Sequence, residues 1–143
     1  MRILVGAVVL AMATTITPAF AGDSTWLICK GKADRAGTAF PLVASLHEHR
    51  SPKGDGRDIS VTLIYGEHVA RGLIAGWSAQ KPGALTATLV DGRKSKLFTG
   101  TAGVDDQLSE IELAGTIDEN FGDDAKVSMV KLKAKLICEA QEP

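Results

Sequence analysis

The sequence is poor in aromatic residues and in histidine, and it has no large surplus of charge of either sign. Aromatic side chains make up 5% of the 143 residues, and there are three histidines. Lys and Arg number 16 against 17 Asp and Glu, which gives a formal net charge of −1. Nucleic-acid-binding proteins usually carry a basic surplus and stacking surfaces. We therefore expect no nucleic acid among the partners of this protein.

Long apolar runs are also absent, except at the start of the chain. Arg2 precedes an almost purely apolar run from Ile3 to Ala13, and Ala19-Phe20-Ala21 forms an A-x-A motif. The run is far shorter than the ~20 residues that a membrane-spanning helix needs. This layout predicts a secretory signal peptide over 1–21 and a single domain over 22–143. We expect export to the periplasm or the extracellular space, and no membrane span.

Motifs for catalysis or cofactor binding are missing. No glycine-rich stretch has the spacing of a phosphate or dinucleotide site. The stretch "GWSAQ" around Ser78 is not the G-x-S-x-G nucleophile motif. The acidic stretches "GVDDQ" and "DENFGDD" lack the regular spacing of a calcium loop, and solvated turns explain them better. We expect that the protein is not an enzyme.

The only two cysteines, Cys29 and Cys138, lie near the two ends of the expected domain. In an exported chain such a pair predicts a disulfide. A redox pair would more often read C-x-x-C, and thiolate metal sites usually need more cysteines. A bridge requires the two Cα atoms to lie within roughly 7 Å of each other. The first and last strands should therefore be neighbours.

Alternation of apolar and polar residues is the main structural signal. From Val130 to Cys138, apolar side chains fall on even positions and lysines on odd ones, which is the period of a strand. Similar runs recur between turn signals, and no segment has a helical period. We predict an all-β, antiparallel barrel of about eight strands, with a two-sheet sandwich as the alternative. The expected strands are 24–33, 39–49, 57–65, 68–76, 84–90, 93–101, 107–117 and 125–138.

The Asp91-Gly92 pair is the strongest hairpin signal. Pairing across it places Leu85 opposite Phe98, which suits a core. The same register turns Lys94 and Lys96 toward that core as well. Either these lysines extend to solvent at an open end or the register differs.

His47 and His49 lie two residues apart on an expected strand, so their side chains share one face. Glu48 points to the opposite face. The third histidine, His68, opens the expected strand 68–76, so His49 and His68 should lie at opposite ends of the strand 57–65 between them. Two imidazoles alone predict at most a weak Zn²⁺ or Cu²⁺ site, because a functional site needs at least one further protein ligand.

The function expected from the sequence is binding, through loops or the mouth of the barrel. Arg50, Lys53, Arg57 and Trp77 are the candidate contact residues, although basic residues in loops usually only interact with solvent and Trp77 is expected in the core rather than at an interface. An inhibitor is one form of this hypothesis, and the build resembles small periplasmic inhibitor barrels in architecture and size only. The alternative is a metal-binding protein that uses the two neighbouring histidines. The sequence names neither the protein or small-molecule ligand nor the oligomeric state.

Overall fold

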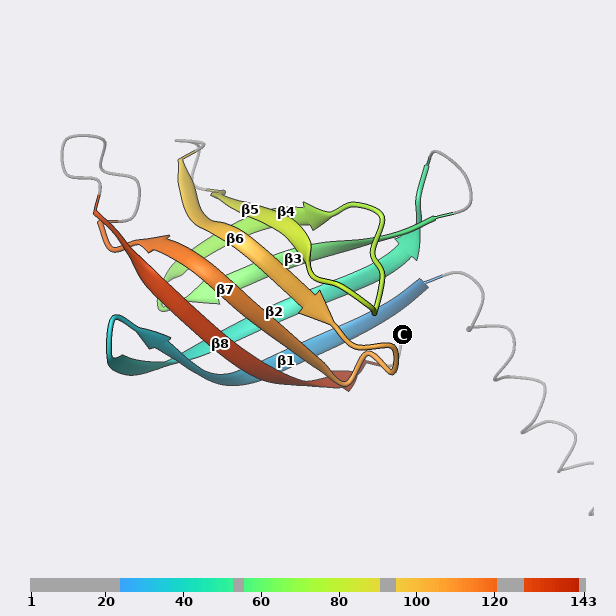
Figure 1. The fold of residues 1–143 in the computed structure, drawn as a ribbon, viewed down its shortest axis with the longest axis horizontal. Coiled ribbons are helices and arrows are strands. Elements are labelled where there is room, and N and C mark those ends of the chain that lie inside the picture. Colours follow the sequence, from blue (N-terminus) through green and yellow to red (C-terminus); the bar gives the residue numbers. More distant parts are fainter. Residues whose placement is uncertain (1–23, 53–55, 91–94, 121–127, 142–143) are drawn as a thin grey trace, which may run out of the picture.

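The computed structural model describes residues 24–52, 56–90, 95–120 and 128–141. These residues form eight strands, each paired antiparallel with the next, in a closed barrel (Figure 1). The strands are β1 (Ser24–Arg35), β2 (Thr38–Arg50), β3 (Arg57–Tyr65), β4 (His68–Ile74), β5 (Gly83–Leu89), β6 (Lys96–Val104), β7 (Glu110–Asp118) and β8 (Met129–Ala140). The predicted all-β antiparallel barrel is therefore confirmed, and the sandwich alternative is excluded.

The barrel closes where β1 meets β8. Cys29 lies directly opposite Cys138 in the β1–β8 register, and the two form a disulfide across a sequence separation of 109 residues. The predicted bridge between the terminal strands is thus present. Its presence is compatible with an oxidising location. All eight strands have two neighbours, although β4 and β5 share only two register pairs, Ala70 with Leu89 and Arg71 with Thr88.

The interior is filled by side chains. Alternation along each strand sends one set of residues inward, and an eight-stranded barrel is just wide enough for such side chains to fill it. The largest fully buried side chains are Phe98, Leu42, Leu46, Ile59, Leu63, Ile74, Leu85, Leu97, Ile111, Leu113, Ile117 and Leu132. The outer wall and the two ends of the barrel are therefore the surfaces on which a partner can bind.

The register between β5 and β6 differs from the prediction. Ala87, not Leu85, lies opposite Phe98, and the register shifts after this pair. This β-bulge lets the consecutive residues Leu97 and Phe98 both face the core, while Lys96 is exposed. The predicted conflict between apolar and lysine side chains is thereby removed at Lys96; Lys94 lies outside the described residues.

Two of the interior positions require glycine. Gly100 on β6 and Gly115 on β7 are register partners. A Cβ atom added to Gly100 would lie 2.2 Å from the Ala114 carbonyl oxygen. The absence of side chains at this pair lets β6 and β7 approach closely inside the barrel.

The barrel has two ends, and each is closed by side chains. At the first, which we call the Trp77 end, lie the start of β1 and the connections β2–β3, β4–β5 and β6–β7 (Figure 1). At the other, the Tyr65 end, the Arg35 guanidinium donates to the Tyr65 hydroxyl and forms an ion pair with Glu119 at 3.4 Å. Phe40 packs edge-on against Tyr65, with ring centroids 4.5 Å apart.

Candidate functional site

A row of four residues crosses the outer wall close to the Trp77 end. Trp26 on β1 lies opposite His47 on β2, His47 opposite Ser60 on β3, and Ser60 opposite Leu73 on β4. Each of the four alternates with buried neighbours along its strand, so all four side chains face outward. His49 lies two residues from His47 on this same wall. We call these five residues the Trp26 face.

Trp26 is the most prominent side chain of this face. It is 51% exposed, and its ring stacks on the His47 imidazole with centroids 3.8 Å apart and planes 9° apart. One face of the indole is therefore held by His47, and much of the ring still meets solvent. Leu73, at the other end of the row, is 46% exposed. A half-exposed tryptophan held in one orientation is a typical anchor for a binding partner.

The two predicted histidines do lie together. The ring centroids of His47 and His49 are 4.9 Å apart. His49 uses both nitrogens, with Nε2 at 3.0 Å from the Ser60 hydroxyl and Nδ1 at 3.2 Å from the Arg50 carbonyl oxygen. Desolvation by burial and the adjacent His49 lower the pKa of His47 below its ordinary value, although Glu48 acts in the opposite direction. His47 therefore binds a proton less readily than a free imidazole does.

A third metal ligand does not join the pair. His68 lies opposite Tyr65 at the Tyr65 end of β3, whereas His49 lies opposite Asp58 near its other end. The predicted remoteness of His68 is thus confirmed. Among residues 24–52, 56–90, 95–120 and 128–141, no group of three or more His, Cys, Asp or Glu could hold a metal ion. One chain therefore offers two imidazoles for a metal and no more from its described part.

Arg57, a predicted contact residue, is held by an internal partner. Its Nη2 donates to Oε1 of Glu48 at 2.8 Å, and its Nε donates to Oε2 of the same carboxylate. The Glu48 side chain is only 8% exposed and that of Arg57 is 25% exposed. Both residues belong to the inward-facing sets of their strands. The ion pair closes the Trp77 end between β2 and β3.

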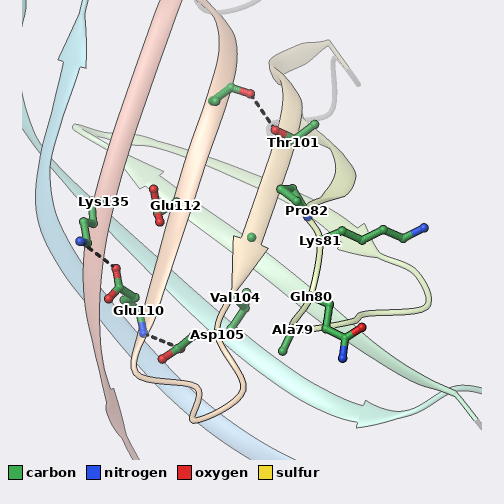
Figure 2. A pocket seen from close by; sticks show the side chains of 12 residues that line it. Ala79, Gln80, Lys81, Pro82, Thr101, Val104, Asp105, Glu110, Glu112 and Lys135 are labelled. Carbon is green, nitrogen blue, oxygen red and sulfur yellow. Dashed lines mark hydrogen bonds and ion pairs between the residues drawn. The ribbon is translucent and has the colours of Figure 1, made fainter.

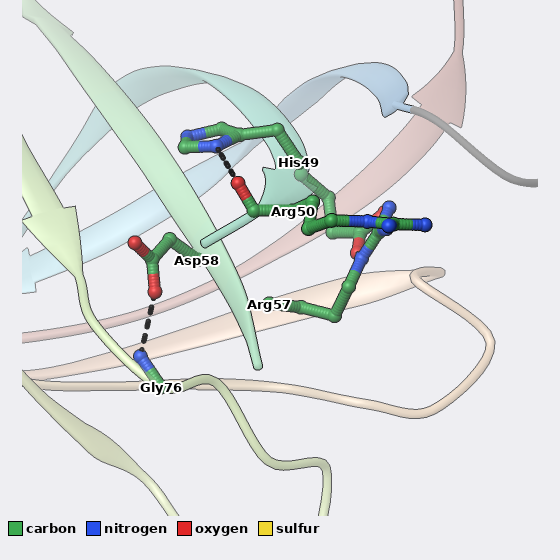
Figure 3. Close-up of polar contacts among 6 residues, drawn as sticks. His49, Arg50, Arg57, Asp58 and Gly76 are labelled. Atoms are coloured by element: carbon green, nitrogen blue, oxygen red, sulfur yellow. Dashed lines mark hydrogen bonds and ion pairs between the residues drawn. The ribbon is translucent and has the colours of Figure 1, made fainter. Parts of the chain in front are cut away.

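The β4–β5 connection folds back over the same end. The Gly76 amide donates to Oδ1 of Asp58 at 2.9 Å, as Figure 3 shows beside the His49–Arg50 contact. The Trp77 amide donates to the Arg57 carbonyl oxygen at 2.7 Å. The Trp77 indole nitrogen donates to the Val104 carbonyl oxygen at 3.0 Å, and its ring packs against the core. Trp77 thus has a structural role in covering the barrel end.

The remaining two predicted contact residues lie in or beside the β2–β3 connection. Arg50 is exposed as the last residue of β2, next to His49, and can meet a partner at the rim of the Trp26 face. Lys53 lies outside the described residues. The connection is closed by a hydrogen bond of 2.8 Å from the Ser51 amide to the Gly56 carbonyl oxygen.

A groove of about 470 Å³ with mixed polar and apolar walls lies on another part of the wall, between the β4–β5 connection and strands β6 to β8 (Figure 2). It is hollow beside Gly103 and Ala114 because these residues have little or no side chain. An ion pair of 3.2 Å joins Lys135 to Glu110 along one side. None of the residues that line it is aromatic. The groove offers polar contacts of both signs, but no anchor comparable to Trp26.

The acidic stretch "GVDDQ" serves the β6–β7 turn. Asp105 accepts hydrogen bonds from the amides of Ser109 and Glu110, at 2.7 and 3.0 Å, and from the Ser109 hydroxyl. Burial acts to raise the pKa of Asp105, but these hydrogen bonds outweigh it and lower the pKa below its ordinary value. Asp118, which opens "DENFGDD", is buried at the opposite end of β7 and accepts from the Asn120 amide at 2.9 Å. Asp123 and Asp124 lie outside the described residues.

Sequence reasoning did not identify Trp26 or the Glu48–Arg57 pair. A signal for both was present in the alternation pattern. Side chains alternate between the two faces of a strand. Leu27 and Cys29 face inward, so Trp26, next to Leu27, had to face outward. Arg57 shares its parity with the core residues of β3.

Comparison of the chain with protein-family models, with curated proteins and with solved structures finds no significant match. The part of the chain that the structure describes contains no helix with the length and apolarity of a membrane crossing.

Proposed function

We propose that this chain is an exported, non-enzymatic binding module that recognises a partner protein through the Trp26 face and the adjacent rim of the barrel. The observation that carries the proposal is the stacking of Trp26 on His47, which holds a half-exposed indole in one orientation on a rigid wall. Aromatic anchors of this kind supply much of the binding energy in protein interfaces, because little side-chain entropy is lost when they bind.

The surroundings of Trp26 support a protein ligand over a small molecule. The barrel interior is filled by side chains, so a lipocalin-like internal ligand has no place there. The Trp26 face is a row across four strands of the outer wall, with apolar residues at its two ends and imidazole and hydroxyl groups between them. Such a mixture of an aromatic anchor, an aliphatic side chain and polar groups is typical of a protein interface.

Affinity capture from the protein's native extracellular or periplasmic milieu tests this function. The wild-type protein and a Trp26→Ala variant are immobilised in equal amounts, and the retained proteins are quantified. Met129→Ala is the matched control, because Met129 is a 42% exposed apolar residue on β8 at the Tyr65 end. We expect a partner that wild type and Met129→Ala retain equally and Trp26→Ala loses. Equal retention by all three proteins contradicts a role for the Trp26 face.

Metal binding by His47 and His49 is a second candidate function. It is favoured by the 4.9 Å separation of the two imidazole centroids on one outer face. Within the described part of the chain, the nitrogens of His47 have no hydrogen-bond partner that an ion would have to displace. Equilibrium dialysis against Zn²⁺ tests it: wild type should retain zinc, and the His47→Ala, His49→Ala double variant should not. Absence of retained zinc in wild type ends this candidate.

A further inference from the structure

The His47–His49 pair has the geometry of one half of a metal site. The side chains come from alternate positions of one strand, so the rigid barrel wall holds both rings on the same side. A zinc ion in a structural site takes four protein ligands, and one in a catalytic site takes three. The described part of the chain supplies two and holds no third His, Cys, Asp or Glu within reach.

The hydrogen bonds of His49 prepare one of its nitrogens for a metal. The Arg50 carbonyl oxygen can only accept a hydrogen bond, so the Nδ1 at 3.2 Å from it carries the proton. In the neutral ring Nε2 then holds the lone pair, which accepts from the Ser60 hydroxyl at 3.0 Å. A backbone carbonyl that fixes one imidazole nitrogen while the other faces the metal is the usual arrangement around metal-bound histidine. To bind a metal ion, His49 Nε2 has to give up only its hydrogen bond with the Ser60 hydroxyl.

The surface around the pair is suited to a second copy of the same chain. Trp26 and Leu73 expose apolar surface at the two ends of the row that contains His47. The eight strands close into a barrel, so two copies are expected to meet through their outer walls or loops. In a two-fold dimer the same patch meets itself, which places the two histidines of one copy opposite the two of the other.

We propose that Zn²⁺ joins two copies of this chain through His47 and His49 of each copy, with the Trp26 faces in contact. The two copies together supply the four imidazoles that complete a tetrahedral site. This inference rests on the second candidate function, metal binding by the same pair. The ion links the two copies, and burial of Trp26 and Leu73 between them further stabilises the dimer.

Sedimentation velocity at micromolar protein, with and without Zn²⁺, tests the proposal together with the zinc stoichiometry from equilibrium dialysis. We expect a monomer in EDTA, a dimer in Zn²⁺ and one zinc ion for two chains. The single variants His47→Ala and His49→Ala should each weaken zinc-dependent dimerisation by roughly tenfold or more. His68→Ala is the matched control, since His68 lies at the other end of the barrel and should leave dimerisation unchanged.

The possible failures are distinguishable. One zinc ion per chain with a monomeric protein overturns the shared site but keeps metal binding by the pair. No bound zinc overturns both. Zinc-dependent dimers that persist in His47→Ala and His49→Ala show that other residues bind the ion and overturn the inference. Circular dichroism of each variant confirms that it folds, and intrinsic fluorescence adds a local readout because Trp26 stacks on His47.

Discussion

The ion pair between Glu48 and Arg57 should contribute measurably to the stability of the barrel. The two groups make two charge-assisted hydrogen bonds, and the carboxylate is almost fully removed from solvent. Replacing Arg57 with alanine leaves that carboxylate without its cation. Breaking a fully buried pair in this way costs about 3–5 kcal/mol, whereas a surface pair contributes about 0–1 kcal/mol.

The exposure of the two partners places the expected loss between these limits. The Glu48 side chain is 8% exposed, but a quarter of Arg57 meets solvent, which screens the pair and lets water replace part of the interaction. We therefore expect Arg57→Ala to lower the free energy of unfolding by roughly 2–3 kcal/mol. Replacing both partners with apolar residues, in Glu48→Leu with Arg57→Met, should cost less than about 1 kcal/mol because no buried charge is left alone.

Urea denaturation followed by circular dichroism measures these changes. Lys135→Ala is the matched control, because Lys135 also forms an ion pair with a glutamate, Glu110, at 3.2 Å, but is 63% exposed. It should change the free energy of unfolding by less than about 1 kcal/mol. A loss from Arg57→Ala no larger than that of Lys135→Ala would refute the structural role. Arg57 would then again be a candidate contact residue.

Three further predictions concern the closure, the packing and the titration of the barrel. Replacing both Cys29 and Cys138 with alanine should lower the free energy of unfolding by up to roughly 4–5 kcal/mol, because the bridge closes a loop of 109 residues; an unchanged urea midpoint would contradict this. Gly100→Ala should lower the free energy of unfolding by about 1–3 kcal/mol, since its Cβ would meet a carbonyl oxygen at 2.2 Å. In the control Gly56→Ala, the new Cβ meets no atom nearer than 4.0 Å, so the change should stay within about 0.5 kcal/mol. Equal urea midpoints for the two variants would contradict close packing at Gly100. NMR titration should give His47 a pKa below 6.5. The unfolded chain then binds the proton more readily, so stability should fall as the pH drops below about 6.5, and His47→Gln should lose this component; a pKa above 6.5 would contradict the reasoning.

The candidate site illustrates which features could be read from the pattern. The shared face of His47 and His49, the opposite direction of Glu48 and the remoteness of His68 all follow from the period of two along each strand. The partners across strands did not follow, because they depend on register. Trp26 stacks on His47 only because β1 and β2 pair with those two residues opposite each other. Arg57 reaches Glu48 diagonally, because the β2–β3 register places Glu48 opposite Ile59 and Arg57 opposite Arg50.

The sequence by itself determined the all-β class, the approximate positions of eight strands, the inward and outward sets of side chains and the pairing of the two cysteines. These are consequences of local alternation, of turn residues and of there being only two cysteines to pair. The tertiary structure alone decided that the sheet closes as a barrel, that a bulge turns both Leu97 and Phe98 inward, and that Trp77 covers one end. The physical reason is that register, bulges and loop docking are selected by contacts between segments distant in sequence, and local periodicity carries no information about them.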